Sequence, residues 1–277
     1  MQVDPVGAVG AEISGVDLAR LDDRAFAQIK QAFLDHLVLF FREQRLSLEQ
    51  QVALTRRFGP VLRVPYVAHL AEHPDIIAVL KEAEERQVST FGNAWHSDFS
   101  FLEEPPAGSL LYALETPAHG GDTLWANMYM AYETLSEGMR RMLDGLRAIH
   151  TGKPYGVQGG AGIRGSRSIQ ITRGDPEADR QIAHPVVRTH QESGRKALFV
   201  NAIYTTRFEG MSEAESRPLL NFLFEHSTRP EFTCRFRWSN RTLAIWDNRC
   251  TLHYAVNDYD GYRRLLHRTT FAGERPV

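Results

Sequence analysis

The sequence predicts a single domain of mixed, mainly β structure, in which helices flank an antiparallel sheet or barrel. Helical patterns concentrate in some stretches and short apolar runs typical of strands in others, with no regular alternation of the two. The 277 residues include no internal repeat, low-complexity tract or long polar linker, and a chain of this length buries about 70 to 75% of its unfolded surface. We therefore expect one large core, with room for an internal site, over residues 1–277.

Three helices are predicted from apolar periodicity and capping patterns. Apolar residues recur at three- and four-residue steps over residues 23–36, behind an acidic start. Ser47 begins the capping-box pattern S-L-E-Q of a second helix, which should end at Gly59-Pro60. The third helix, over residues 212–227, begins with the same kind of box and carries one apolar face.

Short apolar runs outside these helices are typical of strands. The run at residues 38–41 follows the first helix directly, as a buried strand would. Further strand-like runs cover residues 197–204, 232–238, 242–248 and 267–273. Residues 155–179 are rich in Gly, Ser, Arg and Gln, and long segments of this kind in compact domains are usually lids or binding loops. We expect a flexible active-site loop there.

The charge balance excludes a general attraction to polyanions. Lys and Arg number 32 and Asp and Glu 34, a net charge of −2, so we expect neither nucleic acid nor a membrane as partner. Any anion that the protein binds must therefore be held by arginine side chains at the site itself. Cys234 and Cys250 lack the CxxC spacing of zinc or redox sites. With no signal-peptide pattern and no run of 18 apolar residues, the sequence predicts a cytoplasmic protein.

Two H-x-D triplets make candidate metal sites, at residues 96–98 and 73–75. In a strand, residues i and i+2 point to the same face, so His96 and Asp98 could hold one ion, whereas the proline of the other triplet makes it a turn. The best candidate for a third ligand is His253, just beyond a buried-strand pattern. Two imidazoles and one carboxylate leave the opposite face of the ion open, as in non-haem Fe(II) oxygenases, although catalytic zinc also uses three protein ligands.

The C-terminal run Y-R-R-L-L-H-R-T-T-F adds a second feature. As a strand, it would place Arg264, Leu266 and Arg268 on one face. A guanidinium is a planar fork suited to carboxylates, and a dicarboxylic co-substrate needs a cation at each end. Thr123, in G-G-D-T-L-W-A-N, could add a hydroxyl donor to such a carboxylate. A zinc-dependent hydrolase would have no use for these two arginines and the threonine. A non-catalytic binding barrel would be expected to have lost one of the three metal-binding side chains, and none is missing here.

The order W-H-S-D, G-G-D-T-L-W-A-N, W-D-N-R-C-T-L-H and R-R-L-L-H-R-T-T-F resembles that of the taurine dioxygenase and dichlorophenoxyacetate dioxygenase family of Fe(II)- and 2-oxoglutarate-dependent enzymes. The similarity covers nearly the whole chain. It implies a double-stranded β-helix, a cupin-like jelly-roll, together with a homo-oligomer and a reaction that needs Fe(II), 2-oxoglutarate and O2. By this resemblance the iron ligands are His96, Asp98 and His253.

Spacing along the chain supports the resemblance. His253 follows His96 by 157 residues, and Arg264 and Arg268 follow His253 by 11 and 15. Thr123 follows His96 by 27 residues. Arg268 and Thr123 resemble the pair that holds the distal carboxylate of 2-oxoglutarate, and Arg264 resembles the residue near its C1 carboxylate.

The same resemblance implies hydroxylation of a C–H bond next to a heteroatom in a small organic acid. Taurine-specific members carry a sulfonate-binding histidine where Val64 stands here, and an apolar side chain cannot donate a hydrogen bond. Tyr204 falls where the taurine branch has Phe and the chiral aryloxyalkanoate branch has Tyr. An aryloxyalkanoate or other carboxylate is therefore favoured over a sulfonate or sulfate ester. The predicted substrate pocket comprises Val64, Tyr66, Asn93, Phe101 and Tyr204.

Two further groups of polar residues receive no catalytic role. Asp247 and Asn248 are predicted to make only the local hydrogen bonds of a turn before the third metal ligand. The arginines 164, 167 and 173 lack the interleaved aromatic residues of a nucleic-acid-binding patch. We therefore predict that Arg164, Arg167 and Arg173 lie on a solvated or substrate-facing loop. If the substrate is a sulfonate after all, an arginine of this loop is the best candidate to hold it.

Overall fold

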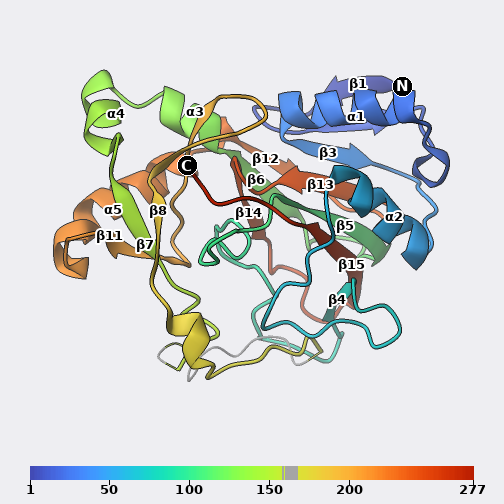
Figure 1. Cartoon of the computed structure of the whole chain (residues 1–277). Coiled ribbons are helices and arrows are strands. Elements are labelled where there is room, and N and C mark those ends of the chain that lie inside the picture. The colour runs from blue at the N-terminus through green and yellow to red at the C-terminus, as the bar shows by residue number, and fades with distance from the viewer. Residues whose placement is uncertain (158, 160–167) are drawn as a thin grey trace.

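The computed structural model describes residues 1–157, 159 and 168–277, and its mainly β architecture with flanking helices is the expected jelly-roll (Figure 1). The largest sheet is antiparallel except where β2 lies parallel to β3. In spatial order its strands are β1 (Gln2–Pro5), β2 (Ala11–Ser14), β3 (Val38–Phe41), β13 (Leu243–Asp247), β5 (Gly108–Glu115), β15 (Arg264–Phe271) and β4 (Ile77–Lys81).

Three smaller sheets complete the β structure of the described residues. The sheet that faces the large one consists of β12 (Thr233–Phe236), β6 (Thr123–Asn127) and β14 (Thr251–Ala255). The other two consist of β11 (Thr205–Phe208), β7 (Arg147–His150) and β8 (Ile182–Pro185), and of β10 (Lys196–Leu198) and β9 (Val187–Thr189).

All three predicted helices are confirmed. The second and third begin with complete capping boxes at Ser47 and Ser212, where side chain and backbone bond reciprocally over three residues. The α-helices of the described residues are α1 (Asp23–His36), α2 (Leu48–Phe58), α3 (Met128–Glu133), α4 (Glu137–Leu143) and α5 (Glu213–Ser227). None of these helices has the length and apolar character that crossing a bilayer requires.

One strand prediction is only partly right. Of residues 197–204, the strand β10 includes only the first two, and the chain then turns. The turn forms because the side-chain oxygen of Asn201 accepts hydrogen bonds from the backbone N–H groups of Ile203 and Tyr204, at 3.2 and 3.0 Å. An Asx turn of this kind interrupts an otherwise apolar run, so a prediction from hydrophobicity alone made the strand too long.

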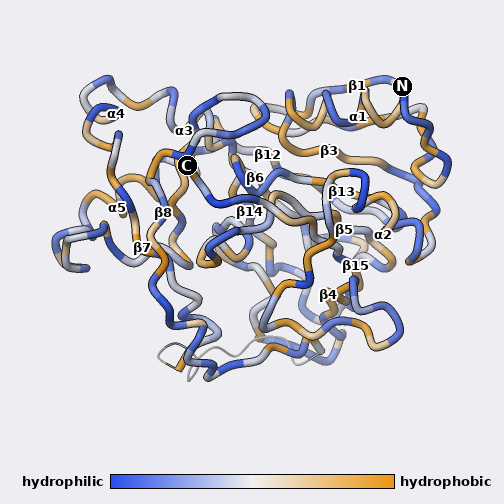
Figure 2. The backbone as a smooth tube through the Cα atoms, in the orientation of Figure 1, coloured by the Kyte–Doolittle hydropathy of each residue, from blue (hydrophilic) through white to orange (hydrophobic). Residues whose placement is uncertain are grey.

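Both faces of the large sheet are buried. Because side chains alternate along a strand, successive residues pack on opposite faces of the sheet. Along β3, Leu39 and Phe41 pack toward α1 and α2, whereas Val38 and Phe40 face the smaller sheet. This strand is hydrophobic along its length in Figure 2. On the inner side Trp125 of β6 lies 5.3 Å from the ring of Phe40, so the two sheets pack as a sandwich. The helices therefore stabilise one face, and the other is available for a site.

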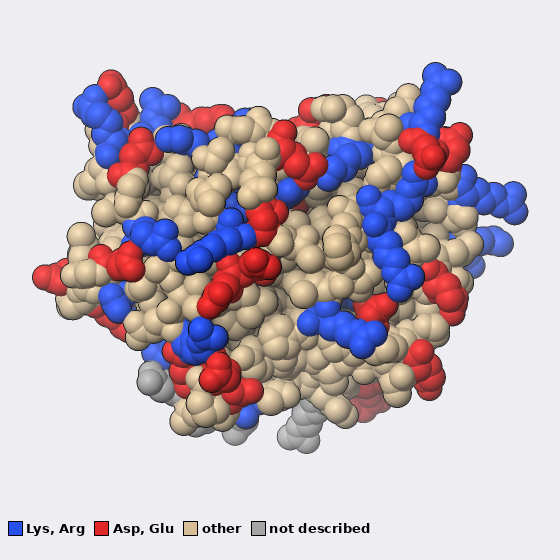
Figure 3. All heavy atoms as spheres, viewed as in Figure 1, with Lys and Arg blue, Asp and Glu red and all other residues tan. Residues whose placement is uncertain are grey.

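The predicted loop at residues 155–179 lies partly outside the described residues, and Arg164 and Arg167 fall there. The part of this loop from residue 168 onward is anchored to the rest of the chain, because an isolated β-bridge joins Val67 to Ile171. A short 3₁₀ helix follows at Pro176–Asp179. On the face drawn in Figure 3, positive and negative side chains are interspersed, in keeping with the small net charge.

A buried ion-pair cluster holds the connection between β13 and β14. Both carboxylate oxygens of Asp247 accept hydrogen bonds from Arg249, at 2.9 and 2.7 Å, and one of them lies 3.0 Å from Nε2 of His190. Burial alone would raise the pKa of the Asp247 carboxyl, but Arg249 and His190 hold it well below its usual range. The folded state therefore favours the charged carboxylate.

We expect Asp247→Ala to lower the free energy of unfolding by about 3 kcal/mol, because the buried Arg249 would keep only its pair with the partly exposed Glu192, and His190 would lose its partner. Urea denaturation at pH 7 measures this change. Since the folded-state pKa of Asp247 is lowered, its stabilisation is present above the unfolded carboxyl pKa of about 3.9 and is lost as the pH falls below it. Glu103→Ala, which removes an exposed pair with Arg180, serves as control and should cost under about 1 kcal/mol. Equal losses in both variants would contradict the prediction.

Candidate active site

The segment that carries His96 and Asp98 is a loop, so the prediction that both lie in a strand is wrong. His96 makes a single antiparallel bridge with His253, with backbone hydrogen bonds of 3.1 and 2.8 Å between the two residues. A turn then begins at Asp98, and Phe99 adopts a left-handed φ of 47°. This turn ends the extended chain and brings Asp98 beside the histidines.

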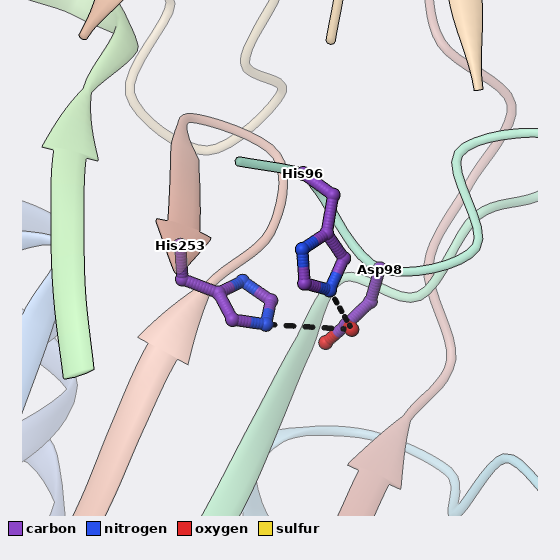
Figure 4. Close-up of side chains that lie close together, drawn as sticks. All are labelled: His96, Asp98 and His253. Carbon is purple, nitrogen blue, oxygen red and sulfur yellow. Dashed lines mark ion pairs between the residues drawn. The ribbon is translucent and has the colours of Figure 1, made fainter. Parts of the chain in front are cut away.

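Three buried ligand atoms converge at this point. The Nε2 atoms of His96 and His253 each lie 3.6 Å from Oδ1 of Asp98, and Figure 4 shows both rings pointing at that oxygen. The other H-x-D triplet lies elsewhere. His73 is 3.5 Å from Glu49, and Asp75 pairs with two arginines of the surface.

The protonation states suit a metal. Nδ1 of His96 lies 2.7 Å from the carbonyl oxygen of Ala94, which favours the tautomer that leaves the Nε2 lone pair free. Burial and the neighbouring His96 hold the pKa of His253 well below its usual value, so this ring is neutral. Burial would raise the pKa of Asp98, but Arg268 and His253 lower it well below its usual range. A neutral imidazole and an ionised carboxylate are the forms in which His and Asp bind metals.

The second oxygen of Asp98 is held by the protein. Oδ2 lies 2.6 Å from Nη2 of Arg268 and accepts a hydrogen bond of 3.2 Å from Ser109. The backbone N–H of Asp98 donates to Oδ1 of Asn248 at 3.4 Å, and Ser97 donates to the Asn248 carbonyl at 2.8 Å. The prediction that Asn248 serves only its own turn is therefore wrong. Sequence analysis missed Ser109 entirely, since nothing local marks a strand serine as a partner of a distant carboxylate.

A second cluster of possible ligands fits a metal poorly. His190, Asp247 and Cys250 are buried and near one another, and together with the first triad they form the two such groups of the described chain. Both oxygens of Asp247 are already occupied by Arg249. Burial raises the pKa of the Cys250 thiol well above its usual value, so it stays protonated. The first triad is therefore the candidate metal site.

The residues expected to hold a dicarboxylate line a small cavity with two of the metal ligands. Besides His96 and His253, this cavity is lined by Thr123, Arg264 and Arg268. The inward face of β15 is as predicted, since both arginines are buried on it. The two arginines differ in their contacts, however, because the guanidinium of Arg268 touches the Asp98 carboxylate.

Arg264 lies on the Thr123 side of this cavity. Its guanidinium carbon is 5.8 Å from the centre of the Trp238 ring, whose indole N–H donates to Thr123 Oγ1 at 3.0 Å. The threonine hydroxyl proton is thereby left available to another acceptor. Nε of Arg264 is buried without a hydrogen-bond partner among the described residues. A buried guanidinium with one unpartnered N–H beside a free hydroxyl donor fits a carboxylate.

A larger cavity adjoins the metal site, and two of the five predicted substrate residues line it. Asn93 and Tyr204 are among its wall residues, together with His96 and Asp98. Much of the remaining wall is apolar or aromatic, from Phe91, Gly92, Ala94, Phe99, Pro154, Tyr155, Ile169, Ile171 and Ile203.

The other three predicted substrate residues do not line this cavity. Val64 is buried in the hydrophobic core, and its carbonyl oxygen contacts His69. Tyr66 stacks on Tyr155 with a centroid distance of 5.2 Å, and Phe101 packs behind the wall. Tyr66 and Phe101 both contact the wall residue Tyr155, and the role of all three residues in direct binding stays a prediction.

The jelly-roll fold and the triad define a metal-dependent barrel protein, and comparison with known proteins places it further. The model of the family described as "Taurine catabolism dioxygenase TauD, TfdA family" matches residues 2–270. The chain belongs to this family. Its members are alpha-ketoglutarate-dependent dioxygenases that use Fe(II), 2-oxoglutarate and O2, and this chain is an enzyme of that class.

Several relatives match nearly the whole chain. An "Alkylsulfatase" of Acinetobacter baylyi is 37% identical over 97% of this chain and 83% of its own length. An "Alpha-ketoglutarate-dependent sulfate ester dioxygenase" of Pseudomonas putida is 36% identical over 100% and 91%. An "Alpha-ketoglutarate-dependent 2,4-dichlorophenoxyacetate dioxygenase" of Cupriavidus pinatubonensis is 37% identical over 96% and 94%. Among solved structures, a putative taurine dioxygenase from Burkholderia xenovorans superposes with a TM-score of 0.83, at 38% identity, over 100% of this chain and 94% of that one.

We expect His96→Ala, Asp98→Ala and His253→Ala each to weaken Fe(II) binding by at least about a hundredfold. Loss of a partner outside the ligand set typically costs 10- to 100-fold, and loss of a ligand costs more. Anaerobic calorimetry with Fe(II) measures the affinity, and circular dichroism checks the fold. His73→Ala is the matched control and should bind Fe(II) like the wild type. Unchanged affinity in the His253 variant would move the site elsewhere.

Proposed function

We propose that this enzyme hydroxylates an aliphatic C–H bond next to a heteroatom of a small organic acid, with conversion of 2-oxoglutarate to succinate and CO2. The observation that carries this proposal is the convergence of His96 Nε2, His253 Nε2 and Asp98 Oδ1 beside two cavities. One cavity contains buried arginines for a co-substrate, and the other has apolar walls for a substrate. When bound, the iron supplies the oxidising chemistry, and the chain supplies binding, orientation and exclusion of water.

For the co-substrate we propose the reverse of the assignment first suggested by resemblance. Arg264 and Thr123 hold the distal carboxylate of 2-oxoglutarate, because they lie together away from Asp98 and have free donors. Arg268, whose guanidinium contacts Asp98 Oδ2, is proposed to interact with the C1 carboxylate at the metal end. The triad is proposed to hold Fe(II) through one oxygen of Asp98, since Arg268 and Ser109 retain the other.

For the substrate we propose an aryloxyalkanoate or other small carboxylate. Tyr204 supports this choice, because burial raises the pKa of its phenol well above the usual value and keeps the hydroxyl a neutral donor at the cavity wall. Val64 no longer argues against a sulfonate, since it does not line the cavity. A sulfate ester or sulfonate is therefore the second candidate, and the names of two relatives favour it.

A screen for succinate release tests the function. Purified enzyme with Fe(II) and 2-oxoglutarate is offered aryloxyalkanoates, alkyl sulfates, sulfonates and amino acids. We expect substrate-dependent succinate with at least one organic acid, and the highest kcat/KM with an aryloxyalkanoate. A highest value with an alkyl sulfate would select the second candidate. No succinate with any compound, from enzyme that binds Fe(II), would contradict the proposal.

We expect Arg264→Ala to weaken 2-oxoglutarate binding by at least about thirtyfold, because it removes the partner of a desolvated carboxylate. Arg264→Lys should restore only part of the affinity, since a point charge cannot reproduce the planar fork. Anaerobic titration of the Fe(II) enzyme measures this. Arg263→Ala is the matched control, because Arg263 pairs outside the cavity with Glu82 and Glu115. Normal affinity in Arg264→Ala would refute the assignment.

A further inference from the structure

We infer that His150 is a positioning residue, which holds the turn after Asp98 and the turn that carries Tyr204 in one arrangement. It acts through the hydroxyl group of Ser100. His150 is not among the described residues that line either cavity of the site. The inference rests on the proposed function, in which the larger cavity holds the substrate, because both turns contribute to the wall of that cavity.

His150 lies where two strands of one sheet end. It is the last residue of β7 and pairs in register with Thr205, the first residue of β11. Its side chain is completely buried. The ring stacks on Phe199 with a centroid distance of 5.6 Å and meets the ring of His184 edge-on at 5.4 Å. These ring contacts fix the orientation in which the two ring nitrogens face their partners.

One ring nitrogen of His150 faces the turn that follows Asp98. Nδ1 lies 3.1 Å from Oγ of Ser100, which is two residues beyond the metal ligand. Phe99, between these two residues, has a left-handed φ of 47° and lines the larger cavity. A side chain other than glycine persists in this conformation only where surrounding contacts hold it. The bond between Ser100 and His150 is such a contact.

The same serine hydroxyl is joined to the turn that carries Tyr204. Nδ2 of Asn201 donates to Ser100 Oγ at 2.9 Å. The other end of this amide accepts the backbone N–H groups of Ile203 and Tyr204. Both of these residues line the larger cavity, and the Tyr204 ring lies 6.4 Å from the ring of His96. One amide side chain thus connects the turn after a metal ligand to the opposite part of the wall.

The hydrogen bonds form a complete chain when the His150 ring is neutral. A hydroxyl group has one proton to donate, and the Ser100 oxygen already accepts a proton from Asn201, so its own hydrogen is free to bond Nδ1. The ring proton is then on Nε2, which lies 3.5 Å from Oγ1 of Thr205. Burial and the neighbouring His184 hold the pKa of His150 well below its usual value. The neutral ring is therefore the form present at neutral pH.

Four buried side chains maintain this arrangement, and none of these described residues lines the larger cavity: Ser100, His150, Asn201 and Thr205. Without the acceptor on His150, the Ser100 hydroxyl loses its partner, and Phe99 and Tyr204 are free to shift. A misplacement of about 1 Å can slow an oriented reaction by up to about a hundredfold. The substrate would be held less precisely, while the residues of β14 and β15 would still bind the metal and 2-oxoglutarate.

Hydrogen exchange tests the positioning without turnover. Exchange is measured in the full chain, both metal-free and as the anaerobic complex with Fe(II) and 2-oxoglutarate. We expect the amides of residues 203 and 204 to exchange at least about tenfold faster in His150→Leu, which has no acceptor. His150→Asn should regain part of the protection, because a side-chain oxygen can then take the place of Nδ1. The matched control is His184→Leu, which removes a buried histidine bonded to the Leu102 carbonyl and should leave these two amides unchanged.

Turnover separates positioning from a general structural role. Rates are measured with 2,4-dichlorophenoxyacetate or hexyl sulfate, whichever the wild type oxidises faster. We expect His150→Leu to lower kcat/KM by at least about tenfold and His150→Asn to recover part of this loss. A larger share of the succinate should form without oxidised substrate in His150→Leu. The affinity for 2-oxoglutarate, from anaerobic calorimetry, should change by less than about twofold, and His184→Leu should behave like the wild type.

A second variant keeps the inference testable if His150→Leu does not fold. Ser100→Ala removes the hydroxyl that joins the two turns and should reproduce the faster exchange and the lower kcat/KM. Its control is Ser227→Ala, which removes a buried hydroxyl bonded to the Leu223 carbonyl and should change neither. Equal losses in His150→Leu and His184→Leu would overturn the inference. Unchanged exchange at residues 203 and 204 in the His150 and Ser100 variants would do the same.

The outcomes also distinguish this inference from the proposed function. If the wild type forms succinate normally and the His150 and Ser100 variants do so equally well, the inference fails and the proposed function stands. If the wild type forms no succinate with any compound, the proposed function fails. In that case faster exchange in His150→Leu, with none in His184→Leu, would still support the inference.

Discussion

The active site depends on the contacts of one buried group, the Asp98 carboxylate, which two histidines, an arginine and a serine share. One oxygen faces two imidazole nitrogens, and the other is held by Arg268 and Ser109. A buried ionised carboxylate is very costly unless it is paired and hydrogen-bonded. Its partners come from three strands, β5, β14 and β15, so it is stabilised only when these strands are in register. The chemistry of the site and the topology of the barrel thus require each other.

The same arrangement explains why the protein uses a two-faced sheet. One face packs against α1 and α2 and contributes stability, and the other packs against the smaller sheet that contains His253. Trp125 and Trp246 lie side by side between the sheets and line the cavity of the metal ligands. Large apolar side chains there exclude water, which strengthens the electrostatic contacts of the buried arginines. The Asp247 cluster then fixes the turn from which Asn248 reaches the Asp98 loop.

Fixed and variable parts of the site come from different kinds of structure. His253 and the arginines of β15 lie on strands, His96 is bridged to His253, and the Asp98 carboxylate is held by Arg268 and Ser109, so the candidate site is built on rigid elements. Part of the wall of the larger cavity, including Arg173, lies on a connecting segment, where substitutions disturb the core least. Two relatives of nearly equal identity are named for sulfate esters and for an aryloxyacetate.

The sequence by itself determined what depends on short-range order and on chemical type. Helix starts such as Ser47 follow from local capping, the shared face of Arg264 and Arg268 follows from strand alternation, and the triad follows from the chemistry and order of its residues. Only the tertiary structure decided which arginine touches Asp98, that Ser109 is its partner, and that Val64 lies away from the cavity. These facts depend on distances between strands far apart in the chain. Periodicity along one strand specifies a face but not which neighbour that face meets.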